Sequence, residues 1–157
     1  MKKMALWLLA AVLTPAILVG CAGGQSAPKG TTAEIADKVF AASGVENFGM
    51  PQNLETDEDK EFYLGSRDYP VFSEAVAVMP LINLDTRVLV IIKTADMKDV
   101  EGIKTRLREN VDPNRVVCVT FSLEDVAIES RGDVILMMIN TDAEQRTALV
   151  EAFKSID

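Results

Sequence analysis

The sequence predicts a single α+β domain with a mixed, largely antiparallel sheet and helices packed on one face of that sheet. Three observations support this prediction. Apolar runs and alternating patterns typical of strands fill the middle and the later part of the chain. Helix-capping motifs precede amphipathic segments before, between and after these strands. Removing residues 1–20 from the 157-residue chain leaves 137 residues, which is enough for one domain and not for two.

The N-terminal stretch has the three parts of a secretory signal. Lys2 and Lys3 precede an apolar run over residues 4–19, which is shorter than the about 20 residues that a membrane span needs. The run leads into Leu18-Val19-Gly20-Cys21, which resembles the lipobox of bacterial lipoproteins. This resemblance implies cleavage before Cys21, a diacylglyceryl thioether on its sulfur and acylation of the new amino terminus. The alternative is an ordinary cleaved signal followed by a chance cysteine.

Lipidation at Cys21 would anchor the mature protein to a membrane without a spanning segment. Each buried methylene contributes about 0.8 kcal/mol, so two or more acyl chains hold a protein stably where one chain does not. We therefore expect a signal peptide over residues 1–20, a lipidated cysteine and flexible tether over residues 21–31, and a globular domain over residues 32–157. The domain is expected on the extracytoplasmic face of a bacterial membrane.

The mature chain is strongly acidic. Lys2 and Lys3 leave with the signal, so 14 basic residues remain against 24 acidic ones, and the formal net charge is −10. A chain of this charge without a basic cluster is not expected to bind nucleic acid or to be attracted to anionic lipid headgroups. The expected partners are the lipid bilayer, through acylated Cys21, and an envelope protein whose identity the sequence does not give.

The first helix of the domain has clear start and stop signals. Thr31-Thr32-Ala33-Glu34 is a capping box, because a threonine at the N-cap and a glutamate three residues later satisfy each other's backbone N–H groups. The helix is expected to run to about Ser43, where Gly44 can end it in a left-handed conformation. Residues 45–54, which contain glycine and proline, are expected to form a loop.

A second, short helix is expected over residues 57–64, capped by Thr56 and Asp59 and closed by Gly65. Its acids at positions 57, 59 and 61 superficially resemble a calcium-binding loop. Phe62, however, stands where such a loop needs glycine. We therefore interpret the acids as residues that favour a helix N-terminus.

Two strands are expected next. Residues 71–79 alternate loosely between apolar and polar side chains, and Pro80 ends the strand. Residues 87–93 contain five consecutive apolar residues, which is typical of a strand buried on both faces at the centre of a sheet. Asn83-Leu84-Asp85 is expected to form the turn between the two strands.

A longer helix follows these strands. Asp96 is expected to cap a helix that runs to about Glu109, and basic residues near its end suit the helix dipole. The spacing of its apolar residues predicts one buried face, which consists of Met97, Val100, Ile103 and Leu107.

Residues 115–121 favour a strand, with a short buried helix as the alternative. Cys118 lies among valines in this segment and is expected to be a small buried core residue. It is the one cysteine left once Cys21 is lipidated, so the domain is expected to have no internal disulfide. A nucleophilic or intermolecular role is disfavoured, because the chain has no histidine to activate the thiol.

A hairpin and a last helix complete the chain. Residues 126–130 and 133–140 are expected to pair around Arg131-Gly132. Arg131-Gly132-Asp133 also matches an integrin-recognition tripeptide by letter, but the turn needs its glycine for structural reasons. Thr141-Asp142-Ala143-Glu144 is a further capping box that begins the last helix. The core residues of this helix are expected to be Leu149, Val150, Phe153 and Ile156.

No catalytic, cofactor-binding or metal-binding residues are expected. The chain has no histidine, so it cannot form a Ser-His-Asp or Cys-His set, and it lacks His/Cys clusters for zinc. It also lacks a glycine-rich phosphate-binding loop. A pair of carboxylates of the glycosidase type stays open, because the distance between acids in space decides that case.

One further pattern covers most of the mature chain. It consists of the lipobox and of the segments 33–40, Tyr63-Leu64-Gly65, 75–80, 88–93, 96–101 and Gly132-Asp133-Val134-Ile135-Leu136. In this combination it resembles the small bacterial lipoproteins that carry domain of unknown function 4358. Residues 115–121 depart from that pattern. The family has no established activity, so the resemblance implies no role for any residue.

The sequence thus favours a non-enzymatic binding or protein-interaction module of the cell envelope. An exposed apolar patch or an open sheet edge would support this hypothesis and locate the partner surface. The alternatives are a hydrolase that uses carboxylates only, which a deep cleft with two acids of raised pKa would favour, and a purely structural envelope lipoprotein.

Overall fold

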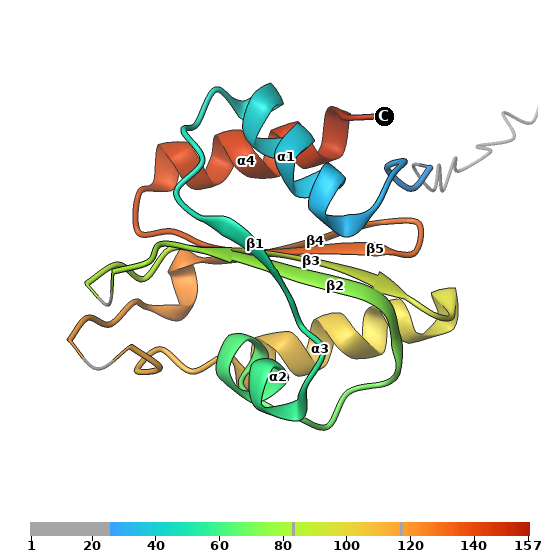
Figure 1. Ribbon diagram of the computed structural model, residues 1–157, viewed down its shortest axis with the longest axis horizontal. Coiled ribbons are helices and arrows are strands. Elements are labelled where there is room, and N and C mark those ends of the chain that lie inside the picture. The colour runs from blue at the N-terminus through green and yellow to red at the C-terminus, as the bar shows by residue number, and fades with distance from the viewer. Residues whose placement is uncertain (1–25, 83, 117) are drawn as a thin grey trace, which may run out of the picture.

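A computed structural model describes residues 26–82, 84–116 and 118–157, and these residues form one five-stranded sheet with four α-helices (Figure 1). The strand order is β1-β2-β3-β5-β4, and each of the four pairings is antiparallel. The elements in chain order are α1 (Thr32–Ser43), β1 (Met50–Asn53), α2 (Asp57–Leu64), β2 (Phe72–Met79), β3 (Val88–Thr94), α3 (Val100–Asn110), β4 (Val126–Arg131), β5 (Val134–Ile139) and α4 (Ala143–Ser155). The predicted α+β single-domain fold is confirmed.

The helices cover both faces of the sheet, whereas the sequence predicted one covered face. Helices α1 and α4 lie on one face, and α2 and α3 lie on the other (Figure 1). The reason is the composition of the two central strands. Every residue of β5 is buried, and in β3 only Lys93 is not, so alternate apolar side chains enter the core on each face. Each fully buried Val, Leu, Ile or Met contributes about 1.5–3 kcal/mol to folding. If helices covered only one face, the apolar side chains on the other face would stay exposed and this contribution would be lost.

The first two helix caps are confirmed, and the last begins one residue later than predicted. The N–H of Glu34 donates to Thr31 Oγ1 at 3.2 Å, and Thr56 with Asp59 forms the same reciprocal pair at α2. At α4 the N-cap is Asp142, whose Oδ1 accepts from the N–H groups of Glu144 and Gln145 at 3.0 and 3.1 Å. The predicted box centred on Thr141 is therefore wrong, because an aspartate one residue later satisfies two helix N–H groups.

Helix α3 is preceded by a single 3₁₀ turn, Met97–Asp99, which begins at Asp96. Val100, Ile103 and Leu107 are buried as predicted. Met97 is 66 % exposed, so its placement on the buried face is wrong. The cause is the change of helix type, because the spacing of 3.6 residues per turn does not extend into a 3₁₀ turn.

The stretch predicted as a loop over residues 45–54 contains the edge strand β1, whose four residues are all exposed. The N–H of Leu54 donates to the carbonyl of Ala75 at 3.0 Å. In an antiparallel pair, successive backbone N–H groups of a strand point alternately toward and away from the neighbouring strand. The N–H of Leu54 points toward β2, so the nitrogen of Pro51, three residues earlier, points away from β2. The proline therefore removes no bond to β2, but it does remove a donor from the open edge of the sheet.

The described residues of the segment 115–121, which exclude residue 117, form neither the predicted strand nor the alternative buried helix. Asp112 begins a turn, with its Oδ1 accepting from the N–H of Asn114 at 2.9 Å, and the carbonyl of Pro113 accepts from Thr120 Oγ1 at 2.9 Å. The segment folds back on itself through these bonds. Cys118 is consequently exposed, so its prediction as a core residue is wrong. Among the described residues of this segment, Val116 and Phe121 are buried.

The β4–β5 hairpin is confirmed, and it explains the Arg-Gly-Asp tripeptide. Gly132 adopts φ 55° in the turn. Arg131 is only 8 % exposed, and its Nη1 donates to the carbonyls of Phe153 and Ile156 at the end of α4. A cation at the C-terminal end of a helix satisfies carbonyls that have no partner within the helix. This arginine holds α4 to the sheet and is not presented for recognition by a receptor.

Candidate functional site

Large apolar side chains are exposed at one end of the sheet. We call this end the tip and define it by five residues that are 41–81 % exposed: Met50, Phe62, Leu81, Ile82 and Leu84. They are five of the eight exposed large apolar residues in the described part of the chain. Isolated exposed apolar residues are normal, but several of them at one end of a domain mark a surface that contacts another molecule.

Three elements bring these side chains together. Met50 of β1 lies opposite Met79, the last residue of β2. The loop that joins β2 to β3 begins at Pro80 and carries the three residues of the tip at positions 81, 82 and 84. Helix α2 presents Phe62, whose ring lies edge-on to that of Tyr63 with the centroids 4.9 Å apart. The sheet thus fixes one part of the tip and a helix fixes another.

Two hollows open at the tip on either side of Ile82. The larger has a volume of about 430 Å³, and Phe48, Met50 and Leu81 help to line it. The smaller has a volume of about 210 Å³, and Phe62, Met79, Val116 and Cys118 line it with Ile82. Polar and charged residues, Asp85 among them, line both hollows as well, and the apolar parts of the walls can accept apolar side chains of a partner.

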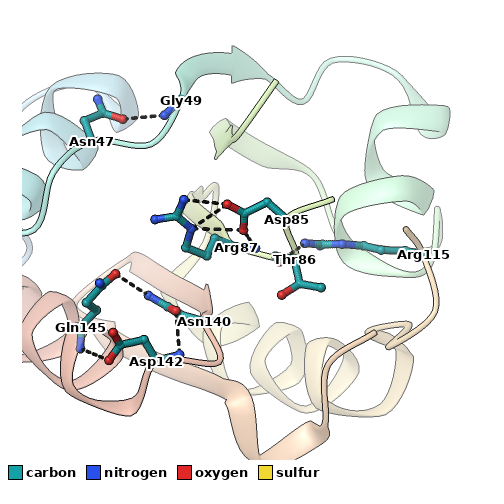
Figure 2. Close-up of polar contacts among 9 residues, drawn as sticks. All are labelled: Asn47, Gly49, Asp85, Thr86, Arg87, Arg115, Asn140, Asp142 and Gln145. Carbon is teal, nitrogen blue, oxygen red and sulfur yellow. Dashed lines mark hydrogen bonds and ion pairs between the residues drawn. The ribbon is translucent and has the colours of Figure 1, made fainter. Parts of the chain in front are cut away.

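An ion pair stiffens the loop that carries the tip. Arg87 Nη2 lies 2.6 Å from Asp85 Oδ2, and Arg87 Nε lies within 3.1 Å of both carboxylate oxygens (Figure 2). The Asp85 carboxylate also accepts from the backbone N–H of Arg87 at 2.9 Å. The hydrogen bonds from Arg87 lower the pKa of Asp85, and the reverse interaction raises the pKa of Arg87. The guanidinium lies 4.8 Å from the ring centroid of Phe48, so the pair also connects the loop to the strand-side wall of the larger hollow.

Arg115 connects the loop to the segment that follows α3. Its Nη2 donates to the carbonyl of Thr86 at 3.0 Å (Figure 2), and its guanidinium lies 5.6 Å from the ring of Phe121. Burial lowers the pKa of Arg115 to about 10, so the group stays cationic at neutral pH. Its Nε and Nη1 are enclosed and have no partner among the described residues. Because these nitrogens are not accessible from the hollow, we interpret Arg115 as a positioning residue that holds two loops together.

A second set of polar contacts holds the neighbouring end of β5. Asn140 is buried, its Oδ1 accepts from the N–H of Asp142 at 2.9 Å, and its Nδ2 donates to Gln145 Oε1 at 3.3 Å (Figure 2). Arg146 of α4 forms an ion pair with Asp125 at 3.5 Å. The start of α4 is thereby fixed to the end of β5 and to the residue that precedes β4. Both lie at the same end of the sheet as the tip.

The described residues show no arrangement typical of acid–base or metal chemistry. They contain no group of three His, Cys, Asp or Glu residues that could hold a metal ion. Three carboxyl groups have a shifted pKa, and each is lowered: Asp59 by Thr56, Asp85 by Arg87 and Asp96 by Lys98. A general acid at neutral pH needs the opposite shift.

A third hollow of about 410 Å³ lies beside β2, and two acids line it, Glu55 and Glu74. Lys60 shares this hollow and forms an ion pair with Asp57 at 3.2 Å. Apolar residues line this hollow too, among them Leu54, Tyr69 and Phe72, but only one exposed large apolar side chain, Val71, lies there, whereas five lie at the tip. We therefore place the candidate functional site at the tip.

The predicted lipidation residue, Cys21, and the predicted signal over residues 1–20 lie outside the described residues. Among the described helices, none has the length and apolar character required to cross a bilayer. The tip itself was not predicted from the sequence. Its signal was present, since Pro80-Leu81-Ile82-Asn83-Leu84 is more apolar than a solvated turn requires.

Comparison of the chain with protein-family models, with curated proteins and with solved structures finds no match.

Proposed function

We propose that this protein is an extracytoplasmic bacterial lipoprotein, anchored through Cys21, that serves as a non-enzymatic protein-interaction module of the cell envelope. The proposal includes the relationship to lipoproteins with domain of unknown function 4358, which rests on the sequence pattern alone. The tip is the partner-binding surface. The observation that carries this proposal is the group of five exposed apolar residues at the tip, beside two hollows whose walls are partly apolar.

Exposure of these side chains has an energetic cost that a partner would remove. Covering apolar surface contributes about 25 cal/mol for each Å² that leaves water. A domain with two complete cores has no folding reason to leave Leu81 81 % exposed in a loop stiffened by an ion pair. Residues at the centre of such patches supply most of the affinity in protein interfaces.

The test is proximity labelling by the lipidated protein at its native membrane. The double variant Leu81→Asp/Ile82→Asp should lose a discrete set of labelled neighbours, because two charges in the patch prevent its burial. Val71→Asp is the matched control, since Val71 is 78 % exposed and precedes β2 at the opposite end of the sheet. Cys21→Ala should lose both the lipid, seen as a mass change of the N-terminal peptide, and the neighbours. Identical neighbours for all three variants would refute the proposal.

A further inference from the structure

The described chain enters the domain at the end of the sheet opposite the tip (Figure 1). Ala27 packs against Gly132 in the β4–β5 turn, where a Cβ built on the glycine would lie 2.9 Å from the Cβ of Ala27. The carbonyl of Lys29 accepts from Lys38 Nζ at 2.7 Å. The same turn accepts from the N–H of Thr94, the last residue of β3, through the carbonyl of Asp133 at 2.8 Å. These contacts fix the entry point of the tether.

The tether is short compared with the sheet. The eight residues of β2 span about 26 Å at about 3.3 Å per residue. The chain from Cys21 to Ser26 spans five residue steps and reaches at most about 18 Å when fully extended. A lipid on Cys21 therefore holds the bilayer near the β4–β5 turn and leaves the tip on the far side of the domain.

The rim of the tip is acidic. Of the two arginines of the site, Arg87 is paired with Asp85, and Arg115 is half-buried and donates to the carbonyl of Thr86. Three exposed acids lie at the rim without an ion pair among the described residues. They are Glu46, which lines the larger hollow, Glu58, one helical turn before Phe62, and Asp112, near Arg115. Such a rim repels an acidic partner, and a second copy of this acidic chain is one.

The open edge of the sheet is a poor site for strand addition. Of the two edge strands, β1 is exposed along its whole length and β4 is largely half-buried, but the nitrogen that Pro51 of β1 turns outward carries no hydrogen. A partner strand would lack a main-chain bond at the middle of a four-residue edge. Recognition at this end of the molecule thus falls to the side chains of the tip.

We propose that the tip binds, on the side of the domain that faces away from the bilayer, a protein segment with large apolar side chains flanked by lysine or arginine. The apolar side chains enter the two hollows, and the cations pair with Glu46, Glu58 and Asp112. This inference rests on the proposed function, since it needs both the lipid at Cys21 and a partner at the tip.

The experiment places a photo-reactive benzoylphenylalanine at Leu81 or at Val71 in the full lipidated chain, at its native membrane. Leu81 should cross-link to a protein through a peptide that contains lysine or arginine, and Val71 should not. Glu46→Lys and Glu58→Lys should each lower the yield of that adduct about two- to fivefold, the usual effect of an exposed ion pair. Asp37→Lys, on the exposed face of α1, is the matched control and should leave the yield unchanged. Raising the salt concentration should lower the yield as well.

Other outcomes overturn the inference in distinguishable ways. An adduct with lipid at Leu81 would show that the tip faces the membrane. An adduct with a second copy of this chain would show that the tip forms a homomeric interface. A protein adduct that withstands all charge reversals would refute the basic partner and leave the proposed function standing. A reaction of neither position with any protein would refute the proposed function together with this inference.

Discussion

Gly65 allows helix α2 to approach the end of α3, and its replacement by alanine tests how tightly these elements are packed. A Cβ on Gly65 would lie 1.7 Å from the carbonyl oxygen of Asn110 and 2.4 Å from its carbon. Both atoms belong to the backbone, so no side chain can turn away. Gly65 also has φ +77°, a conformation that costs an L-residue about 1–2 kcal/mol. Displacing a packed element adds about 1–3 kcal/mol.

Gly44 provides a matched control at the end of α1. It has φ +70°, and a Cβ built on it meets no atom within 4 Å. Gly44→Ala should therefore lower the free energy of unfolding by about 1–2 kcal/mol, through backbone conformation alone. Gly65→Ala should lower it by about 2–5 kcal/mol, because the clash with Asn110 adds to the same conformational cost.

Urea unfolding of residues 22–157, followed by circular dichroism, measures both variants. The slope of the unfolding free energy against urea should stay constant, so the midpoints report the stabilities directly. Gly65→Ala should also shift Phe62, since α2 must move, and so reduce cross-linking at the tip. Equal destabilisation by the two substitutions would refute the close approach of α2 and α3 as the source of the effect.

Three further predictions follow from the described contacts. Burial raises the pKa of both tyrosines of the chain, that of Tyr69 to about 12. Tyrosinate absorbance should therefore titrate above the ordinary pKa of 10. Because the tyrosines lose their protons more readily in the unfolded state, the free energy of unfolding should fall as the pH rises from about 10 to about 12. Tyr69→Phe should remove the part of the absorbance titration that occurs at the higher pH and leave the part that belongs to Tyr63. Titration of both tyrosines at about pH 10 would contradict their burial. Pro51→Thr adds an outward N–H to the edge strand β1 and should increase self-association, measured by sedimentation. Gln52→Thr is the control and should not, because the N–H of residue 52 faces β2. Equal self-association of the two variants would show that Pro51 does not protect the edge. Asp85→Asn should reduce the free energy of unfolding more at neutral pH than at about pH 2. Arg87 lowers the pKa of Asp85 below its unfolded value of 3.8, so the ionised carboxylate stabilises the fold at a pH above 3.8, and this contribution is lost on acidification. Equal losses at the two pH values would refute this prediction.

Local chemistry decided the parts of the fold that the sequence predicted well. Thr31 and Thr56 begin helices because a hydroxyl and an acid three residues later satisfy backbone N–H groups within one turn. The β4–β5 turn forms where Gly132 permits a positive φ. Strand β3 is central because its apolar run cannot face water on either side. Each of these conclusions needs only residues close together in the chain.

Other features depended on partners distant in sequence. From sequence, β1 resembles a loop because Pro51 is followed by the polar residues Gln52 and Asn53, and only the pairing with β2 makes it a strand. Cys118 lies among valines, which favour strands, yet Asp112 and Pro113 fold the segment into turns instead. A propensity for strand has no effect where no neighbouring strand supplies hydrogen bonds.

The sequence by itself determined the acidic charge and the absence of histidine, and it is the source of the predicted lipid attachment at Cys21. Each of these depends only on the identity and spacing of residues. The tertiary structure decided that Met50, Phe62 and Ile82 meet at one end of the sheet and that Ala27 enters at the other. These residues belong to different elements, and their proximity follows from strand register and helix packing. Register and packing depend on the whole core, so the position of a surface relative to its anchor is a property of the folded domain.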